Sequence, residues 1–406
     1  MSMNVGREVR EMRKTRRLTV RQLADRVAIS VSLLEKIENG SRQASSGLIA
    51  ALARALGVGP DRLTGQPYIN GAEAEDRVQA VIPDLRRILL TYDNPDDLAV
   101  APRPLPVLAA EMDTIAQMRQ DGRYVELAPL LPGLLEELTH TALAGWGNSR
   151  VAYWWLARGY RAANSLSHKL GYHDLSLTAV ERTHWAADKS GDPLMQVTAA
   201  YLRAGAMLRM GALASARRIL EGLEQEVERL APEAAMSGAQ MAVQGAILLK
   251  LAVLEARAQR PEAAWQRLAE ARAAAGFLGG DVDHYEMSFG PSNVRIHQVS
   301  MLIEHGDTEQ ALARLREWGT EQDAAEWELP ADLAAERSSH HHIDVAVARL
   351  TEGDRDGALA DLLAARASSP AHTRYHPTVR STASTLVRLD RGQNDRLIQF
   401  ARWVGI

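Results

Sequence analysis

The stretch TVRQLADRVAISVSLLEKIENG, residues 19–40, decides the fold because it contains two short amphipathic helices joined by a tight turn. Leu23 and Val27 give the first predicted helix an apolar inner face, and Leu34 and Ile37 give one to the second. Ala24 lies where the two helices are expected to cross, and a larger side chain there would push them apart. The segment therefore predicts a helix-turn-helix.

The outer face of the second predicted helix carries unusually short side chains for a solvated surface. Such surfaces are normally filled with long Glu, Lys and Arg, which favour helix and solubility. Here the outward positions are Val31, Ser32, Glu35, Lys36 and Asn39. A helix-turn-helix places the N-terminal end of its second helix in a DNA major groove, where long side chains would hold the helix away from the base edges. The short side chains therefore predict DNA binding.

The charge of the chain is unevenly distributed. The 406 residues carry a net charge of −4, whereas residues 1–65 hold twelve Lys and Arg against six Asp and Glu. A small basic head on a large acidic body indicates that the head binds a polyanion and the body does not. The composition is otherwise that of a globular protein rich in Ala, Leu and Arg, which favours helix over sheet.

Helix signals extend this head in both directions. Thr19 and Gln22 have capping-box spacing, Ser30 is a helix cap, and Gly57 ends a further helix before Pro60 starts the last one. Apolar positions at helical spacing also predict a helix over residues 5–17. We expect a five-helix DNA-binding domain over residues 1–66.

This unit resembles the XRE-type family of Cro and phage-repressor regulators. The resemblance covers residues 4–64 and rests on LTVRQLADRVAISVSLLEKIENG followed by LIAALARALGVGPDRL. It implies a lambda-repressor-like fold in which an arginine of the first helix, Arg13, pairs with Glu38. The base-reading positions that it implies are Ser30 at the helix start, Val31, Ser32 and Lys36, and the implied phosphate contacts are Asn39 and Arg42.

Two positions depart from the family pattern. The family often has Gln at the start of the first helix of the motif, where this chain has Val20, so that Arg21 or Gln22 would hold the phosphate instead. The family usually has Gly with positive φ in the turn, where this chain has Ala28, at a cost on the order of 1–2 kcal/mol.

Each predicted contact also has a simpler interpretation. Lys36 is then a solvated lysine, and Val31 covers the turn. Asn39 then closes the helix, and Arg42 is a solvated charge without a binding role in a flexible loop.

Residues 67–106 are expected to be a linker with one helix, because its second half, DNPDDLAVAPRPLP, holds four prolines. From residue 107 to 406 one pattern recurs. Four segments align without gaps, with matching alanines spaced by 48, 47 and 47 residues, and a weaker copy precedes them. The alanines are Ala179, Ala216, Ala264, Ala311 and Ala358. Such repetition predicts an α-solenoid that resembles tetratricopeptide repeats, the alternative being a non-repetitive helical bundle. The fold class is therefore all-α.

The sequence of the body shows no motif typical of catalysis or of phosphate or metal binding. We find no Gly-rich phosphate loop, no G-x-S-x-G and no H-E-x-x-H, and the chain has no Cys. Consecutive His340, His341 and His342 cannot all face one metal on a helix. We therefore expect no catalytic residue, no metal site and no cofactor, and no enzyme. A leader or membrane span is not visible either, which favours a cytoplasmic protein.

A ligand site in the body is expected around DHYEMSFGPSNVRIHQV, residues 283–299, which interrupts the repeats. Its candidate residues are Phe289, Asn293, Arg295 and His297, joined by Trp154, Trp155 and Trp185, which could stack on a ligand. The alternatives are a core phenylalanine and core tryptophans. Phe-Gly-Pro followed by Asn-Val and His resembles segments of actinobacterial regulators with this architecture, and the acidic body mildly favours a cationic or apolar ligand.

Together these features predict a sequence-specific transcriptional regulator that binds double-stranded operator DNA. Its repeat domain is expected to form a homodimer and to sense a peptide or small-molecule effector, with natural-product genes among its targets. The alternative is a DNA-tethered scaffold whose repeat domain binds a protein partner.

Overall fold

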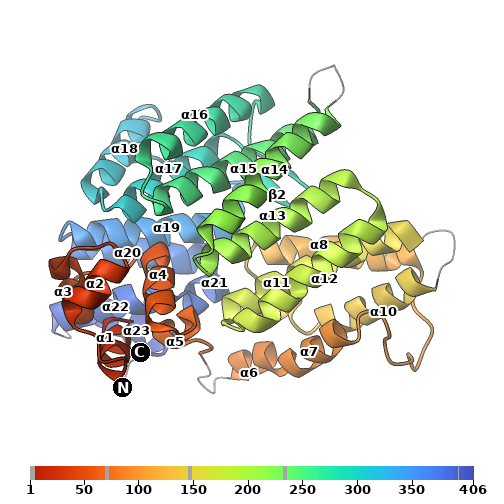
Figure 1. The fold of residues 1–406 in the computed structure, drawn as a ribbon, viewed down its shortest axis with the longest axis horizontal. Helices are drawn as coiled ribbons and strands as arrows, with labels where there is room; N and C mark the ends of the chain where they lie inside the picture. Colours follow the sequence, from red (N-terminus) through yellow and green to blue (C-terminus); the bar gives the residue numbers. More distant parts are fainter. Residues whose placement is uncertain (1–4, 69–72, 145–148, 232–235, 392) are drawn as a thin grey trace.

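The computed structural model describes residues 5–68, 73–144, 149–231, 236–391 and 393–406. Residues 1–4 of the predicted head and 69–72 of the predicted linker lie outside this range. The described chain is almost entirely helical (Figure 1). Its one described sheet is a hairpin of two three-residue strands.

Five helices form the head at one end of the molecule (Figure 1). They are α1 (Val5–Thr15), α2 (Val20–Arg26), α3 (Val31–Glu38), α4 (Ser46–Leu56) and α5 (Pro60–Thr64). Their shared core contains Val9, Leu23, Ala24, Leu34 and Leu52, each fully buried. The predicted five-helix unit is confirmed, and Ala24 is buried in its core.

The segment expected to be a linker with one helix has two helices instead. These are α6 (Glu73–Ala80) and α7 (Ile82–Leu90), which join the core of the body. Pro83 lies in the first turn of α7, where proline favours the start of a new helix and so divides the segment at Val81. Leu85, Ile88 and Leu89 recur at helical spacing and are buried, so this segment is part of the body.

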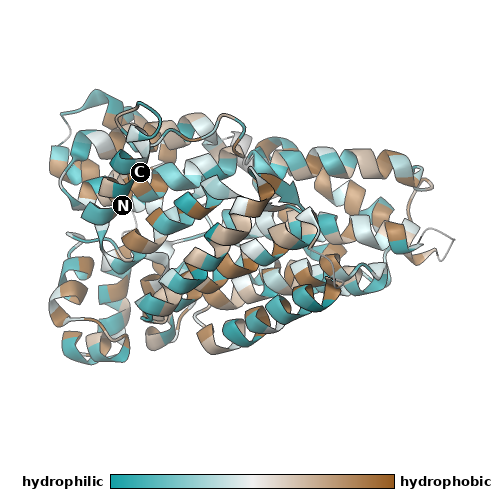
Figure 2. Cartoon of the chain, turned by 90° about the horizontal axis from the view of Figure 1, so that it is seen from above, coloured by the Kyte–Doolittle hydropathy of each residue, from teal (hydrophilic) through white to brown (hydrophobic). Residues whose placement is uncertain are grey.

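The rest of the body is a succession of helices. They are α8 (Leu105–Gln120), α9 (Tyr124–Leu127), α10 (Leu131–Leu143), α11 (Ser149–Leu170), α12 (His173–Ser190), α13 (Pro193–Arg209), α14 (Leu213–Leu230), α15 (Gly238–Arg257), α16 (Pro261–Leu278), α17 (Pro291–His305), α18 (Thr308–Thr320), α19 (Ala335–Thr351), α20 (Arg355–Ser368), α21 (Pro370–Tyr375), α22 (Pro377–Asp390) and α23 (Asp395–Val404). The hairpin of β1 (Val282–His284) and β2 (Met287–Phe289) separates α16 from α17. Figure 2 shows that most of these helices carry both hydrophobic and hydrophilic residues.

Consecutive helices pack in pairs, and the predicted alanines lie at the contacts. Helices α11 and α12, α13 and α14, α15 and α16, α17 and α18, and α19 and α20 are neighbours in this sense. The matching alanines lie on the second helix of each pair, and all five are fully buried. A methyl side chain at these points allows the paired helices to approach closely.

Helix α15 forms the centre of the body. It is long and apolar enough to cross a membrane by length and composition, but most of it is buried among other helices of the body. Gly245 on α15 contacts the ring of Phe289, which is 1% exposed. Phe289 therefore lies in the core of the body, which is the alternative to a ligand contact that the sequence left open.

Replacing Gly245 by alanine is expected to destabilise the body. A Cβ at this position would lie 2.0 Å from Cζ of Phe289, so the ring has to move. We expect a loss of about 1–3 kcal/mol in the free energy of unfolding, measured by urea denaturation. The control is Gly222→Ala on α14, where a Cβ meets nothing within 4 Å and replacement of a mid-helix glycine stabilises by about 0.5–1 kcal/mol. Equal stability of the two variants would contradict the packing described for Phe289.

Candidate nucleic-acid interface

The turn between α2 and α3 is fixed by local hydrogen bonds. The side chain of Thr19 accepts from the amide of Gln22, and the side chain of Gln22 accepts from the amide of Thr19, which confirms the predicted capping box. Ser30 caps α3 by accepting from the amide of Leu33. Ala28 has a φ of +55°, the left-handed conformation predicted for the turn. These contacts set the angle at which α3 leaves the turn.

Helix α3 has one buried and one exposed face. Leu34 and Ile37 pack inward with at most 1% exposure. The outward side chains Val31, Ser32, Glu35 and Lys36 are exposed. The predicted base-reading side chains therefore share one open surface with a low profile. Whether they read bases stays a prediction.

A buried ion pair ties the end of α3 to α1. Nε of Arg13 donates to Oε1 of Glu38 at 2.5 Å, and Nη2 donates to Oε2 at 2.8 Å. A third bond runs from Nη1 of Arg13 to the carbonyl of Leu18 at 2.9 Å. The hydrogen bond with Glu38 raises the pKa of Arg13, against the opposing effect of burial. The predicted structural pair is confirmed, and both of its side chains are almost fully buried.

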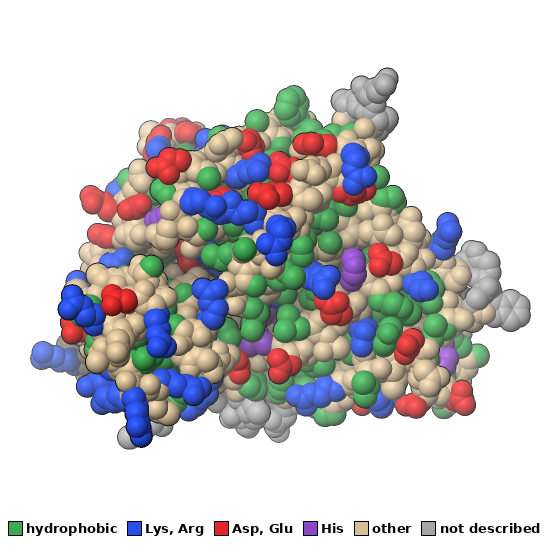
Figure 3. Space-filling model, viewed as in Figure 1, with side chains coloured by type: hydrophobic (Ala, Val, Ile, Leu, Met, Phe, Trp, Pro, Cys, Tyr) green, Lys and Arg blue, Asp and Glu red, His purple; other side chains and the backbone are tan. Residues whose placement is uncertain are grey.

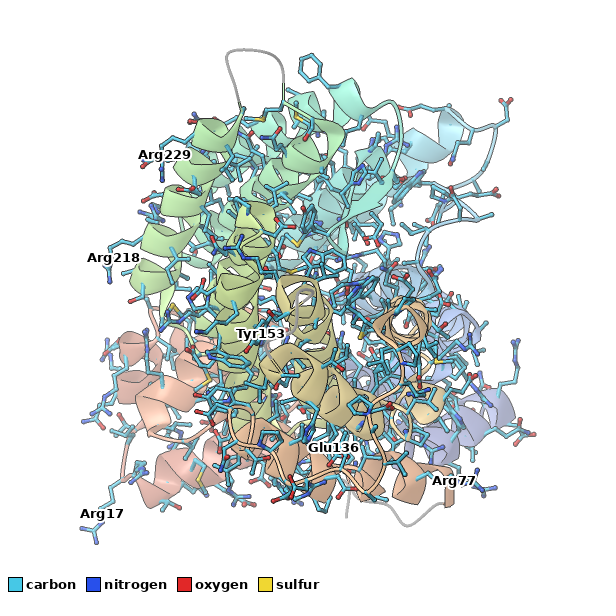
Figure 4. The ribbon with its side chains drawn as sticks, turned by 90° about the vertical axis from the view of Figure 1, so that its right-hand side faces the viewer. Arg17, Arg77, Glu136, Tyr153, Arg218 and Arg229 are labelled. Atoms are coloured by element: carbon cyan, nitrogen blue, oxygen red, sulfur yellow. The ribbon has the colours of Figure 1, made fainter. Side chains whose placement is uncertain are left out.

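The head is the more basic end of the molecule. Lys and Arg side chains gather over α1–α5 in the space-filling view (Figure 3). Arg17 extends outward from this domain (Figure 4). Arg21 is exposed at the start of α2, whereas the side-chain oxygen of Gln22 is used in the cap. A basic surface beside an exposed helix is what binding to a phosphate backbone requires.

The predicted phosphate-binding segment after α3 faces the body. Oδ1 of Asn39 accepts from the amide of Ser41 and closes the turn, as its alternative interpretation had it. The guanidinium of Arg42 lies close to Gly306, at the end of α17. Arg388 of α22 donates to the carbonyls of Asn39 and Gly40, at 3.0 and 2.5 Å.

A carboxylate of the body occupies the N-terminus of α4. Oε1 of Glu304 accepts from Oγ of Ser45 at 2.7 Å and from the amide of Gly47 at 3.0 Å. Helix N-termini bind anions because their amides are unpaired and the helix dipole is positive there. Nη1 of Arg54, near the other end of α4, donates to the carbonyl of Gly211. The head is thus held against the body through α4 and the segment before it.

Comparison with known proteins agrees with this geometry. Residues 4–64 match the family model of a helix-turn-helix domain. The head is therefore a helix-turn-helix domain, which suggests a DNA-binding regulator. No curated protein and no solved structure matches the chain. The match covers the head alone, so the body is interpreted from its own structure.

The predicted effector residues do not all lie together. Asn293 and His297 line a cavity of about 420 Å³ in the middle of the body. Arg295 lies elsewhere: it pairs with Glu321 and stacks near Trp318. The three tryptophans Trp154, Trp155 and Trp185 pack against the core of the body and do not line this cavity.

The cavity is lined by residues that the sequence interpretation did not single out. Among them are Arg161, Arg209, Lys250, Glu286 and Arg337. One signal was available, because Lys250 is the sole ionisable residue in the apolar run 238–254. The others lie on different helices, and their sequence positions do not indicate that they meet.

Replacing Ala28 by glycine is expected to stabilise the head. Glycine adopts positive φ without the steric cost that alanine bears there, which is about 1–2 kcal/mol. The greater freedom of glycine in the unfolded chain opposes this gain, so we expect a net increase of about 0.5–1 kcal/mol in the free energy of unfolding. Thermal denaturation followed by circular dichroism measures it. A lower melting temperature for Ala28→Gly would contradict the left-handed conformation.

Proposed function

We propose that this protein is a sequence-specific, cytoplasmic transcriptional regulator and not an enzyme. Its head binds operator DNA through α3, and its body dimerises and senses an effector. The observation that carries the DNA-binding role is the exposed, short-chained face of α3 with its capped N-terminus. Dimerisation is inferred from physical need, because one small module makes few base contacts, whereas two modules on a two-fold axis read successive major grooves.

The body is proposed to be a tetratricopeptide-like solenoid. Support comes from the succession of helix pairs and from the buried alanines at the same place in each second helix. The first helices of five pairs, α11, α13, α15, α17 and α19, all contribute residues to the cavity. Solenoids of paired helices bind ligands on the concave surface formed by one set of helices. The effector, a small molecule or a short peptide, is proposed to bind there, and natural-product genes are proposed targets.

The contacts between head and body support a regulatory mechanism. The family resemblance implies phosphate contacts by Asn39 and Arg42. Arg388 binds the carbonyls of Asn39 and Gly40, and Glu304 binds the N-terminus of α4 that follows this segment. DNA and the body therefore compete for the same groups. An effector that favours release of the head raises DNA affinity, and one that favours the docked arrangement lowers it.

DNA selection tests the proposed function. We expect the full-length protein to enrich one sequence from a pool of random duplexes at low salt, with two half-sites about 10 base pairs apart if the protein is a dimer. Lys36→Ala is expected to lose discrimination at one position by about 1–3 kcal/mol, because a lysine at this position reads guanine O6 and N7. The measurement is competitive binding to the selected duplex and its single-base variants.

The control is Lys14→Ala, which removes the same charge from an exposed position on α1. It is expected to weaken binding to all sequences alike. If Lys36→Ala leaves base preference untouched, α3 is not in the proposed register. If the protein ignores duplexes of every sequence, the proposed function is wrong.

Glu304→Ala tests the competition between body and DNA. Removing this carboxylate frees Ser45 and the amide of Gly47, so we expect DNA affinity to rise severalfold. Glu309→Ala is the matched control, since Glu309 is an exposed carboxylate on the following helix. Operator binding by fluorescence anisotropy measures both variants. Unchanged affinity for Glu304→Ala would show that the docked head already binds DNA.

A further inference from the structure

The central cavity of the body is strongly basic. Its walls come from α8, α11, α13, α15, α17 and α19 together with the hairpin. Among its described lining residues, the cationic side chains are Arg119, Arg161, Lys169, Arg209, Lys250, Arg257 and Arg337. The carboxylates are Glu286 and Glu336. A cavity of about 420 Å³ is of the size that binds small molecules.

Both carboxylates are already engaged. Glu286 accepts from Arg158 and lies 2.9 Å from Nη2 of Arg119 and 3.6 Å from Nε of Arg161. Burial acts to raise the pKa of Glu286, but these three arginines hold it at about 2. Glu336 pairs with Lys169 at 2.5 Å. Each carboxylate thus neutralises cations on its own side of the cavity.

Three basic side chains of the cavity remain without a carboxylate partner in the described part of the chain. Arg209, Lys250 and Arg337 make no ion pair with any carboxylate in the described part of the chain. Burial and the neighbouring Arg257 lower the pKa of Arg209 to about 10, so it stays charged near neutral pH. All three residues are half-buried, so each side chain has lost part of its hydration without forming an ion pair in return, and this is costly.

Lys250 shows this cost most directly. Its Nζ lies 3.8 Å from the centre of the Tyr201 ring, and it fits because Gly205 has no Cβ, which would lie 2.8 Å away. Burial lowers its pKa well below the usual value, and the charges of Arg209, Arg161, Arg337 and Arg257 lower it further. An unpaired lysine is better replaced by an apolar residue if stability alone matters.

A neutral group that lines the same cavity also lacks a hydrogen-bond partner. Oδ1 of Asn293, a residue 4% exposed, is buried and accepts no hydrogen bond, although Nδ2 donates to the carbonyl of Ser288. A ligand with a hydrogen-bond donor near its anionic group would satisfy this oxygen.

We propose that this cavity binds a small molecule bearing a phosphate or carboxylate group, held by Arg209, Lys250 and Arg337. The proposal names the chemical class of the effector, and its regulatory meaning rests on the proposed function. It replaces the expectation of a cationic or apolar ligand, which followed from the net charge of the body. That charge lies on other surfaces, whereas the cavity is basic.

The cavity reaches the contact between head and body. A second pocket of about 280 Å³ lies between the head and the body, lined by Ser46 and Ile49 of α4 and by Pro60 and Thr64. Five residues line both spaces: His168, Lys169, Arg209, Arg257 and His340. Nε of Arg257 also lies 3.8 Å from Glu304, the carboxylate at the N-terminus of α4. An anion in the cavity therefore acts on the group that holds the head.

Matched pairs of probes test the site in the full-length protein at constant ionic strength. One pair is glucose 6-phosphate and glucose, and the other is citrate and its neutral trimethyl ester. We expect an anionic member at millimolar concentration to raise the melting temperature and to give a calorimetric binding isotherm, and its neutral partner to do neither. The pair that responds distinguishes phosphate from carboxylate. If neither anion binds, the proposal is overturned.

Variants separate a binding role from a structural one. Lys250→Met is expected to raise the melting temperature without ligand, because it removes a half-buried amine that has no ion-pair partner, and to weaken anion binding about tenfold or more. Arg337→Gln is expected to weaken binding in the same way if Lys250→Met does not fold. The control is Lys189→Met on α12, an exposed lysine outside the cavity. Anion binding unchanged in both cavity variants would overturn the site.

Measurements of DNA binding test the proposed function separately from the anion site. Anion binding that also changes operator affinity supports the cavity as the effector site. Anion binding without any effect on DNA overturns the effector role and leaves the site. Failure of DNA binding in the presence of anion binding overturns the proposed function alone.

Discussion

The close approach of paired helices is the constraint on which the rest of the structure depends. Each second helix carries a fully buried alanine where it meets the first, so the pairs stack with their first helices on one side. The stack curves until the C-terminal helices contact the start of the body, with α19 beside α8 and α21 beside α9 and α11. The cavity is the space left inside that curve. A bulky residue at those alanines would widen the pairs and change both the curvature and the cavity.

The cavity of the body differs in charge from the body as a whole, and the net charge does not show this difference. The body is acidic overall, yet its interior collects cations from helices far apart in the sequence. The sequence shows Lys250 within an apolar helix, but it does not show that Arg209 and Arg337 lie across the same space. Such convergence depends on tertiary packing, which periodicity within one helix does not encode. The sequence therefore offered only the net charge of the body as a guide to the ligand class.

Local features were predictable where local chemistry decides them. The capping box of Thr19 and the cap at Ser30 follow from short-range rules. The left-handed Ala28 followed from the family resemblance, and the buried alanines followed from their regular spacing in the sequence. The hairpin was missed because its turn places Tyr285 and Glu286 at positive φ, where glycine, asparagine or aspartate is the usual signal. The docking of Arg388 on Asn39 joins residues 349 apart and has no local signal at all.

Hydrogen bonds join the docked head to the body in the described part of the chain. They include those of Gln43, Arg54 and Gln66 from the head and of Glu304 and Arg388 from the body, each contributing about 0.5–3 kcal/mol net. Glu304 contacts the N-terminus of α4 on one side and lies 3.8 Å from Nε of Arg257, a residue that lines the cavity, on the other. In the proposed mechanism, coupling between cavity and head therefore requires no long pathway, because one carboxylate lies between them.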